Sequence, residues 1–253
     1  MTASATTAPA YEIRALHTAT TVTVYQAYTP SLGLPAARDG RFPDAWKRDR
    51  MTWIKPSFLW MMYRCGWGTK EGQETVLAVE ITREGFDWAL AHAALSHYEQ
   101  GVHPDRATWQ RDLRRAPARV QWDPERDLHL NRLPYRSLQL GLAGEASRRY
   151  ADEWTVAIRD VTPAAREIHE LVRAGRTDAA AALLPEETAY PLPEGTPLPV
   201  APATDQAALP TAVMEPPSTA ACAASASRSR GDTSQAAVVF PAPARPPISS
   251  TPG

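Results

Sequence analysis

The feature that most constrains this chain is the segment RMTWIKPSFLWMMYRCGW, which spans residues 50–67. It contains three of the eight tryptophans and three of the five methionines of the whole sequence. Pro56 suits the first turn of a helix, where its missing N–H needs no partner, and Gly66 suits the position after the last turn. A helix with apolar side chains on both sides belongs inside a protein. The segment therefore predicts a buried central helix, entered from a basic, tryptophan-containing stretch.

A change in composition divides the chain into three parts. Eleven of the 24 prolines follow residue 193, and the part beyond it has no tryptophan or tyrosine. Such a composition cannot bury enough apolar surface to offset the entropy lost on ordering. We expect a flexible arm over residues 1–10, one globular domain over residues 11–193, and a disordered, Pro/Ala-rich tail over residues 194–253.

The net charge excludes no class of ligand, but the charge is unevenly distributed. The chain has 27 basic and 28 acidic side chains. From Arg38 to Lys70, however, there are eight cations and only three acids, and five of those cations are arginines. Such a local excess favours an anionic partner, and arginine suits planar anions. A drift in base composition would produce the same preference for arginine.

Cysteine, histidine and hydropathy patterns narrow the class of protein further. The two cysteines, Cys65 and Cys222, offer neither a disulfide framework nor a CxxC motif, and the histidines lack ligand spacing, so we predict no metal site. No window of about 20 apolar residues and no signal-peptide pattern is present. We therefore expect a cytoplasmic protein without membrane contact.

Hydrophobic periodicity predicts both strands and helices. Alternating or β-branched runs predict strands at residues 20–28, 74–81, 119–123 and 135–142. Apolar spacing and capping residues predict helices at residues 30–39, 56–65, 83–98, 105–115, 145–158, 162–174 and 178–184. Because strands and helices do not alternate strictly, their order favours an α+β fold. We expect a single domain with a small mixed or antiparallel sheet packed on the buried central helix.

Four stretches of this sequence resemble a known family. They are VYQAY at residues 24–28, RMTWIKPSFLWMMYR at residues 50–64, QWDPERD at residues 121–127 and YRSLQ at residues 135–139. Together they resemble the family called domain of unknown function 4291 (DUF4291), and the similarity covers about residues 12–193. The resemblance implies domain boundaries and carries no catalytic residues with it.

The entrance of the central helix is the first candidate site. Arg50 and Lys55 bracket Trp53 just before the helix begins, where free backbone N–H groups favour anions, and Arg64 lies on the helix itself. Cations beside aromatic rings suit phosphates and stacked bases, so all four residues are candidates for ligand binding. The alternative is that Trp53 packs in the core while the cations surround it on flexible stems.

The last predicted strand is the second candidate site. Ser137 and Gln139 share its polar side, and Glu145 follows in a bend bracketed by glycines. We assign Gln139 and Glu145 to catalysis, together with Tyr25 of the first strand. Arg136 and Ser137 are assigned to ligand binding. The same pattern also describes a half-solvated strand, followed by a helix whose first turn favours a carboxylate.

A third candidate is the end of the first strand, which carries Tyr25, Gln26 and Tyr28. A polar aromatic strand end, a central helix and a late glutamate resemble the layout of ADP-ribosyltransferases, which use NAD. The sequence departs from that pattern, because no Gln-x-Glu or Glu-x-Glu motif lies on a late strand. The likeness concerns the fold alone.

We therefore predict a domain that binds or acts on a phosphate-bearing ligand, either a nucleotide or a nucleic-acid segment, through a basic, tryptophan-rich pocket. No cofactor is predicted for this function. Two alternatives stay open. The chain could be a non-catalytic interaction module whose Pro-rich tail recruits a protein partner, or an ADP-ribosyltransferase-like enzyme with NAD as its cofactor.

Overall fold

The computed structural model describes residues 9–196, so the predicted tail and arm lie almost entirely outside the described residues. The strands are β1 (Arg14–Ala15), β2 (Thr21–Tyr28), β3 (Thr52–Ile54), β4 (Thr75–Thr82), β5 (Ala93–Leu95), β6 (Ala118–Arg126), β7 (Arg132–Leu142), β8 (Thr155–Asp160) and β9 (Thr188–Ala189). The helices are α1 (Pro30–Asp39), α2 (Phe58–Cys65), α3 (Arg83–Ala91), α4 (Arg106–Arg115), α5 (Glu145–Arg149), α6 (Thr162–Arg173), α7 (Thr177–Ala182) and a π-helix (Tyr150–Trp154).

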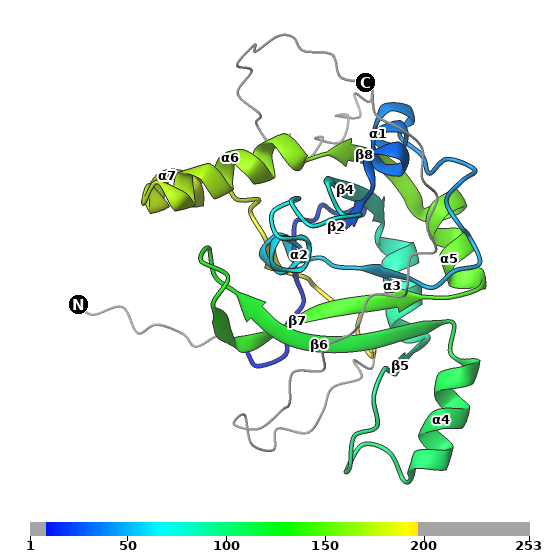
Figure 1. Ribbon diagram of the computed structural model, residues 1–253. Helices are drawn as coiled ribbons and strands as arrows, with labels where there is room; N and C mark the ends of the chain where they lie inside the picture. Colours follow the sequence, from blue (N-terminus) through cyan, green and yellow to red (C-terminus); the bar gives the residue numbers. More distant parts are fainter. Residues whose placement is uncertain (1–8, 197–253) are drawn as a thin grey trace, which may run out of the picture.

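Two larger sheets form the framework of the fold (Figure 1). One is antiparallel, in the order β2-β4-β8, and the other has the order β3-β7-β6-β5, in which β5 and β6 are parallel. The Tyr25 amide donates to the Lys55 carbonyl at 2.7 Å and so ties β2 to the chain just after β3. The predicted α+β class is confirmed, with the strands divided between these two sheets and a two-stranded pair of β1 and β9.

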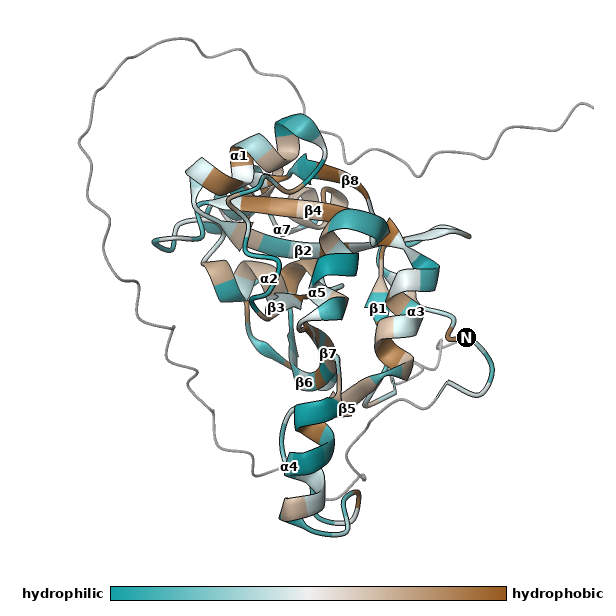
Figure 2. Cartoon of the chain, turned by 90° about the vertical axis from the view of Figure 1, so that its right-hand side faces the viewer, coloured by the Kyte–Doolittle hydropathy of each residue, from teal (hydrophilic) through white to brown (hydrophobic). Residues whose placement is uncertain are grey.

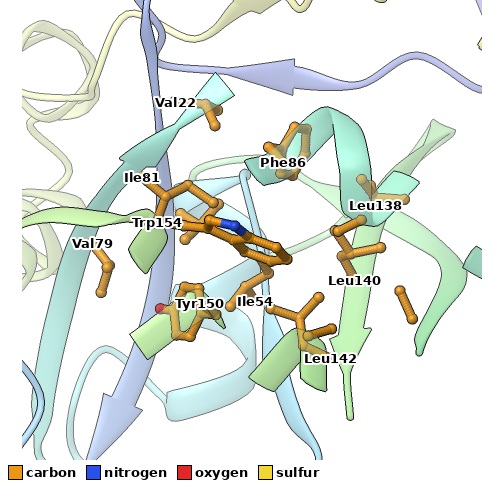
Figure 3. Packing of buried hydrophobic residues seen from close by; sticks show 14 of the residues in the cluster. Val22, Ile54, Val79, Ile81, Phe86, Leu138, Leu140, Leu142, Tyr150 and Trp154 are labelled. Carbon is orange, nitrogen blue, oxygen red and sulfur yellow. The ribbon is translucent and has the colours of Figure 1, made fainter. Parts of the chain in front are cut away.

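The main core lies between the two larger sheets (Figure 3). Alternation places Val22 and Ile81 on the inner side of the first sheet, and Leu138 and Leu140 on the inner side of the second. Trp154 lies between these two groups, at the end of the π-helix. The predicted strand 135–142 therefore turns the side opposite its polar residues to the core, as expected.

The central helix α2 packs on the opposite side of β2 and β4. A second apolar cluster contains four α2 residues at helical spacing, Phe58, Met61, Met62 and Cys65. The helix begins at the Ser57 cap, whose hydroxyl accepts from the Trp60 amide at 3.1 Å, and it ends at Gly66 in the left-handed conformation. The predicted buried helix is thus confirmed, with its apolar stripe on β2, β4 and α6.

The predicted helix at residues 145–158 is wrong in its second half. The α-helix ends at Arg149, a π-helix follows, and Thr155–Asp160 forms strand β8 against β4. The spacing of Tyr150, Trp154 and Ile158 matches a helical period. In the fold, however, the β-branched residues of this stretch lie beside β4, whose second edge is open for pairing. Pairing with that edge provides the backbone hydrogen bonds that a helix would have made within the segment. Tertiary context therefore decided between strand and helix.

The predicted helix at residues 83–98 is also too long. It ends at Ala91, and Ala93–Leu95 pairs in parallel with β6 as strand β5. The expected surface helix at residues 105–115 is confirmed as α4, which projects beyond β5 with a mostly hydrophilic surface (Figure 2). No helix within residues 9–196 is long and apolar enough to cross a bilayer.

Candidate functional site

Alternation along the second sheet separates an apolar side from a polar side. Val120 and Trp122 of β6 point into the main core, so the residues between them point the other way. We define the polar face as the residues of β3, β6 and β7 that lie on the side of the sheet away from the core, together with the residue that follows β3. They are Trp53, Lys55, Arg119, Gln121, Asp123, Ser137, Gln139 and Gly141.

The strand register brings distant residues of the polar face into rows. Gly141 pairs with Trp53 on one side and with Arg119 on the other. A Cβ atom at Gly141 would lie 3.0 Å from the Trp53 ring, so the missing side chain is what lets the indole lie over the strand. The next row brings Gln139 opposite Gln121.

Helix α2 turns its other side toward this polar face. The Lys55 ammonium nitrogen lies 5.2 Å from the centre of the Trp60 ring. The Arg126 guanidinium, at the end of β6, lies 3.5 Å from the centre of the Tyr63 ring. Tyr63 is 41% exposed, so this side of the helix is partly open to solvent. Arg64, the next residue, is close enough for its charge to act on Lys55.

Lys55 is a buried cation without a bound acid. The residue is 6% exposed, and its Nζ donates to the Trp53 carbonyl oxygen at 3.3 Å. Within residues 9–196, no carboxylate oxygen lies within 4.0 Å of Nζ. Burial and the charge of Arg64 lower the pKa of Lys55 to about 7, against a smaller opposing effect of Asp123. Near neutral pH the amine is therefore populated in both protonation states.

Asp123, the acid that faces Lys55, already has two hydrogen-bond donors. Its carboxylate accepts from the side-chain amide of Gln121 at 3.1 Å and from that of Gln139. These amides hold the carboxylate in place on the sheet. Because Asp123 does not reach Lys55 for an ion pair, the lysine remains available to a ligand.

Several donors around the polar face are buried without a partner. Among the described residues, Trp60 Nε1, Arg119 Nε and Arg126 Nε are buried N–H groups without a hydrogen-bond acceptor. An unsatisfied buried donor costs about 1–3 kcal/mol, and each one in a native protein needs an explanation. Arg119 belongs to the polar face and the Trp60 ring packs against Lys55, so an anionic or carbonyl-bearing ligand there would supply acceptors.

Sequence analysis missed a second polar cluster, at the N-terminus of α2. The Phe58 amide donates to Glu187 Oε1 at 2.6 Å, and the Ser57 hydroxyl donates to Glu125 Oε1 at 3.0 Å. Burial raises the pKa of both carboxyl groups, that of Glu187 most, and the charge of Glu125 adds to the rise at Glu187. The Tyr25 hydroxyl is buried nearby without a partner. Glu125 lies in the QWDPERD motif, but nothing local indicates Glu187, whose contact spans 129 residues.

This cluster predicts how stability depends on pH. A carboxyl whose folded-state pKa is raised gives stability that is complete below about pH 4.3 and is lost as pH rises through the folded-state pKa. Glu187→Gln keeps the oxygen that accepts from Phe58 and removes the charge that faces Glu125 and Tyr25. We expect the variant to be more stable than the parent at pH 8, with a difference that shrinks toward pH 4. Chemical denaturation at both pH values measures it, with Glu186→Gln on the exposed neighbour as the control; a variant less stable at pH 8 would contradict the expectation.

Two predicted site residues lie away from the polar face. Glu145 is exposed in the first turn of α5, with Oε1 3.9 Å from Arg149. Arg50 is exposed, and its carbonyl accepts from the Ser147 hydroxyl at 3.1 Å. Both therefore lie near α5, at the opposite end of β3 from Lys55. A shallow surface depression here is lined by Glu145, Arg148, Arg149, Asp152 and Glu153.

The remaining predicted residues divide between two sides of the sheet. Ser137 is buried on the polar side, close enough to Glu125 to oppose the rise of its pKa. Arg136 alternates to the other side, and its amide donates to the Ala10 carbonyl at 2.9 Å. The backbone of Tyr25 pairs with that of Lys55, but its side chain lies beneath α2 with the carboxyl cluster. Of the predicted residues, the polar face and α2 bring together Trp53, Lys55, Arg64, Ser137 and Gln139.

The family of this chain is indicated by a match over most of the described residues. A family model described as "Domain of unknown function (DUF4291)" matches residues 12–190. This range contains the polar face, α2 and the carboxyl cluster. No curated protein matches the chain.

Proposed function

We propose that this chain, which belongs to the DUF4291 family, binds a phosphate-bearing ligand, a nucleotide or nucleic-acid segment, on the polar face beside α2. Lys55 and Arg64 contact the anion in this proposal. Trp53 or Trp60 contributes an indole ring for stacking or for a wall, and Gln139 helps to orient the ligand.

The observation that supports this proposal most is the unpaired buried charge of Lys55. Two cations, Lys55 and Arg64, act on each other, and the nearest acid is held by two glutamine amides. Burying a charge without a partner is costly, and the arrangement is relieved when an anion arrives between the cations. A ligand phosphate would therefore raise the pKa of Lys55 and stabilise the folded protein.

The proposal predicts which variant weakens binding. In a melting-shift titration with AMP at pH 7, Arg64→Gln should raise the dissociation constant by about tenfold or more, because a charge-assisted hydrogen bond is lost. Arg115→Gln, at the exposed end of α4, is the matched control and should bind like the parent. Equal AMP affinity in the parent and Arg64→Gln would contradict the proposal.

The same titration has a predicted pH dependence. Above pH 7 the AMP phosphate stays fully ionised, since its second pKa is about 6, while Lys55 loses its proton. AMP should therefore bind more weakly at pH 8.5 than at pH 7. In Lys55→Met the difference between the two pH values should disappear.

A second candidate function uses the end of β2. Gln26 accepts from the Tyr150 hydroxyl at 2.7 Å and donates to the Thr52 hydroxyl at 2.6 Å, while the charge of Arg50 acts on Tyr28. This cluster joins the strand end to the π-helix, a type of helix that is frequent at functional sites. It supports the ADP-ribosyltransferase-like alternative, in which NAD binds here. NAD stabilisation that Arg50→Gln removes and Arg64→Gln does not would favour this function.

The interaction-module alternative depends on residues 194–253, nearly all of which lie outside the described residues. Deleting them separates the two classes of function. AMP binding by the shortened chain should equal that of the full chain if the polar face carries the function, whereas a module would lose its protein partner.

A further inference from the structure

Lys55 has surroundings unlike those of the other lysines. The chain contains three lysines, of which Lys47 and Lys70 are exposed whereas Lys55 is 6% exposed. Its Nζ lies above the Trp60 ring, and the Trp53 carbonyl is its one hydrogen-bond acceptor among residues 9–196. The amine is therefore packed against an aromatic ring rather than held by an ion pair.

This geometry suits a neutral amine better than an ammonium group. An ammonium has three donors, and a single carbonyl at 3.3 Å leaves two of them without an acceptor in the protein. The positive charge of Arg64 opposes a second charge at Nζ. A lysine that is desolvated, or next to another cation, is the form in which an amine acts as a nucleophile.

We propose that Lys55 is a nucleophile toward carbonyl compounds, and that its amine condenses with the aldehyde or ketone group of a phosphate-bearing ligand. Arg64 holds the phosphate of that ligand. The inference rests on the proposed function and deepens it by naming the class of substrate, a phosphorylated aldehyde or ketone.

The condensation balances without an added oxidant or reductant. The lone pair of neutral Nζ forms a bond to the carbonyl carbon as the C=O π bond breaks, and one of the two Nζ protons moves to the carbonyl oxygen to give a carbinolamine. The carbinolamine then loses its hydroxyl group with one proton as water, and an imine forms between Nζ and the former carbonyl carbon. The Trp60 ring, which packs against the amine, reduces the access of water that would reverse this step.

The experiment uses pyridoxal 5′-phosphate, a phosphate-bearing aldehyde, as the probe. The full-length chain is incubated with the probe at pH 7 and reduced with borohydride, and the modified residues are identified by peptide mass spectrometry. Lys47, Lys70 and the N-terminal amine serve as internal controls. Pyridoxal without the phosphate, and the variants Lys55→Arg and Arg64→Gln, form parallel arms.

We expect Lys55 to be labelled at least about tenfold faster than Lys47 or Lys70, because a hydrated ammonium ion has no free electron pair with which to attack a carbonyl group. Labelling of Lys55 should fall off below pH 7. Lys55→Arg should retain labelling at the control amines alone. Pyridoxal should label Lys55 of the parent protein at least about fivefold more slowly than pyridoxal 5′-phosphate does. Pyridoxal 5′-phosphate should label Lys55 of the Arg64→Gln variant more slowly by the same factor.

Other labelling results would overturn either the nucleophile or its phosphate contact. Slower labelling at Lys55 than at the exposed lysines would end the nucleophile inference. If AMP still stabilises the protein in that case, the proposed anion binding survives without the imine. Equal labelling of Lys55 by pyridoxal and pyridoxal 5′-phosphate would overturn the assignment of the phosphate to Arg64.

Discussion

Replacing Lys55 by methionine is expected to make the unliganded protein more stable at pH 7 by about 2–4 kcal/mol, while AMP binds more weakly than to the parent. A lysine whose pKa falls from 10.5 to about 7 favours the unfolded state, which binds the proton more tightly. Methionine keeps an unbranched side chain against Trp60 and removes the charge. The lost hydrogen bond to the Trp53 carbonyl costs about 1 kcal/mol, and that carbonyl still accepts from Gln26 at 3.1 Å.

The pH dependence of this effect identifies its cause. The destabilisation that Lys55 causes is absent above about pH 10.5, grows as pH falls toward 7, and is constant below pH 7. The advantage of Lys55→Met in denaturant unfolding should therefore shrink as pH rises from 7 to 10. Lys70→Met, at an exposed position, is the matched control and should change stability by less than about 0.5 kcal/mol. A less stable Lys55→Met variant would show that the neighbours stabilise the charge, and would remove the physical basis of the proposed ligand binding.

The second large effect is expected at Gly85 in helix α3. A Cβ atom at this position would lie 2.3 Å from Cγ of Trp154 and 2.5 Å from Cδ2. Trp154 is 4% exposed and packed between the two sheets, so the ring cannot move away without disturbing the core (Figure 3). Gly85→Ala should destabilise the protein by about 2–4 kcal/mol, although alanine is the better helix former by about 1 kcal/mol.

Urea unfolding of Gly85→Ala and of Glu84→Ala, at the exposed neighbour in the same helix, measures this effect. The control variant should stay within about 0.5 kcal/mol of the parent. A Gly85→Ala variant that is more stable than the parent would mean that helix propensity exceeds the clash, and that α3 and the π-helix lie further apart than described.

The two effects have opposite causes. Gly85 is small because the fold needs the space for Trp154, so a larger side chain there lowers stability without any gain. Lys55 is charged in a place where an apolar side chain would suit the fold better. Residues that lower stability in this way are expected at functional sites rather than at purely structural ones.

Local patterns were enough to identify most elements. The period of the apolar residues around Phe58 gave the buried side of α2, and alternation gave the core side of the strand that ends at Leu142. Ambiguity arose where a pattern fitted two structures, as for residues 155–158. There the free edge of β4 determined that the chain forms a strand, and edge pairing has no signature in a single sequence.

The amino-acid sequence by itself determined the α+β class, the central helix and the candidacy of Trp53, Lys55 and Arg64, because these depend on spacing along a few neighbouring residues. Only the tertiary structure decided that Lys55 on the polar face lies near Arg64 of α2, that glutamines bind Asp123, and that Arg50 and Glu145 lie elsewhere. It alone brought Glu187 to Phe58, across 129 residues. The reason is that strand register and helix packing are set by the burial of the whole core. Charged residues that are distant in the sequence therefore come together only in the folded protein.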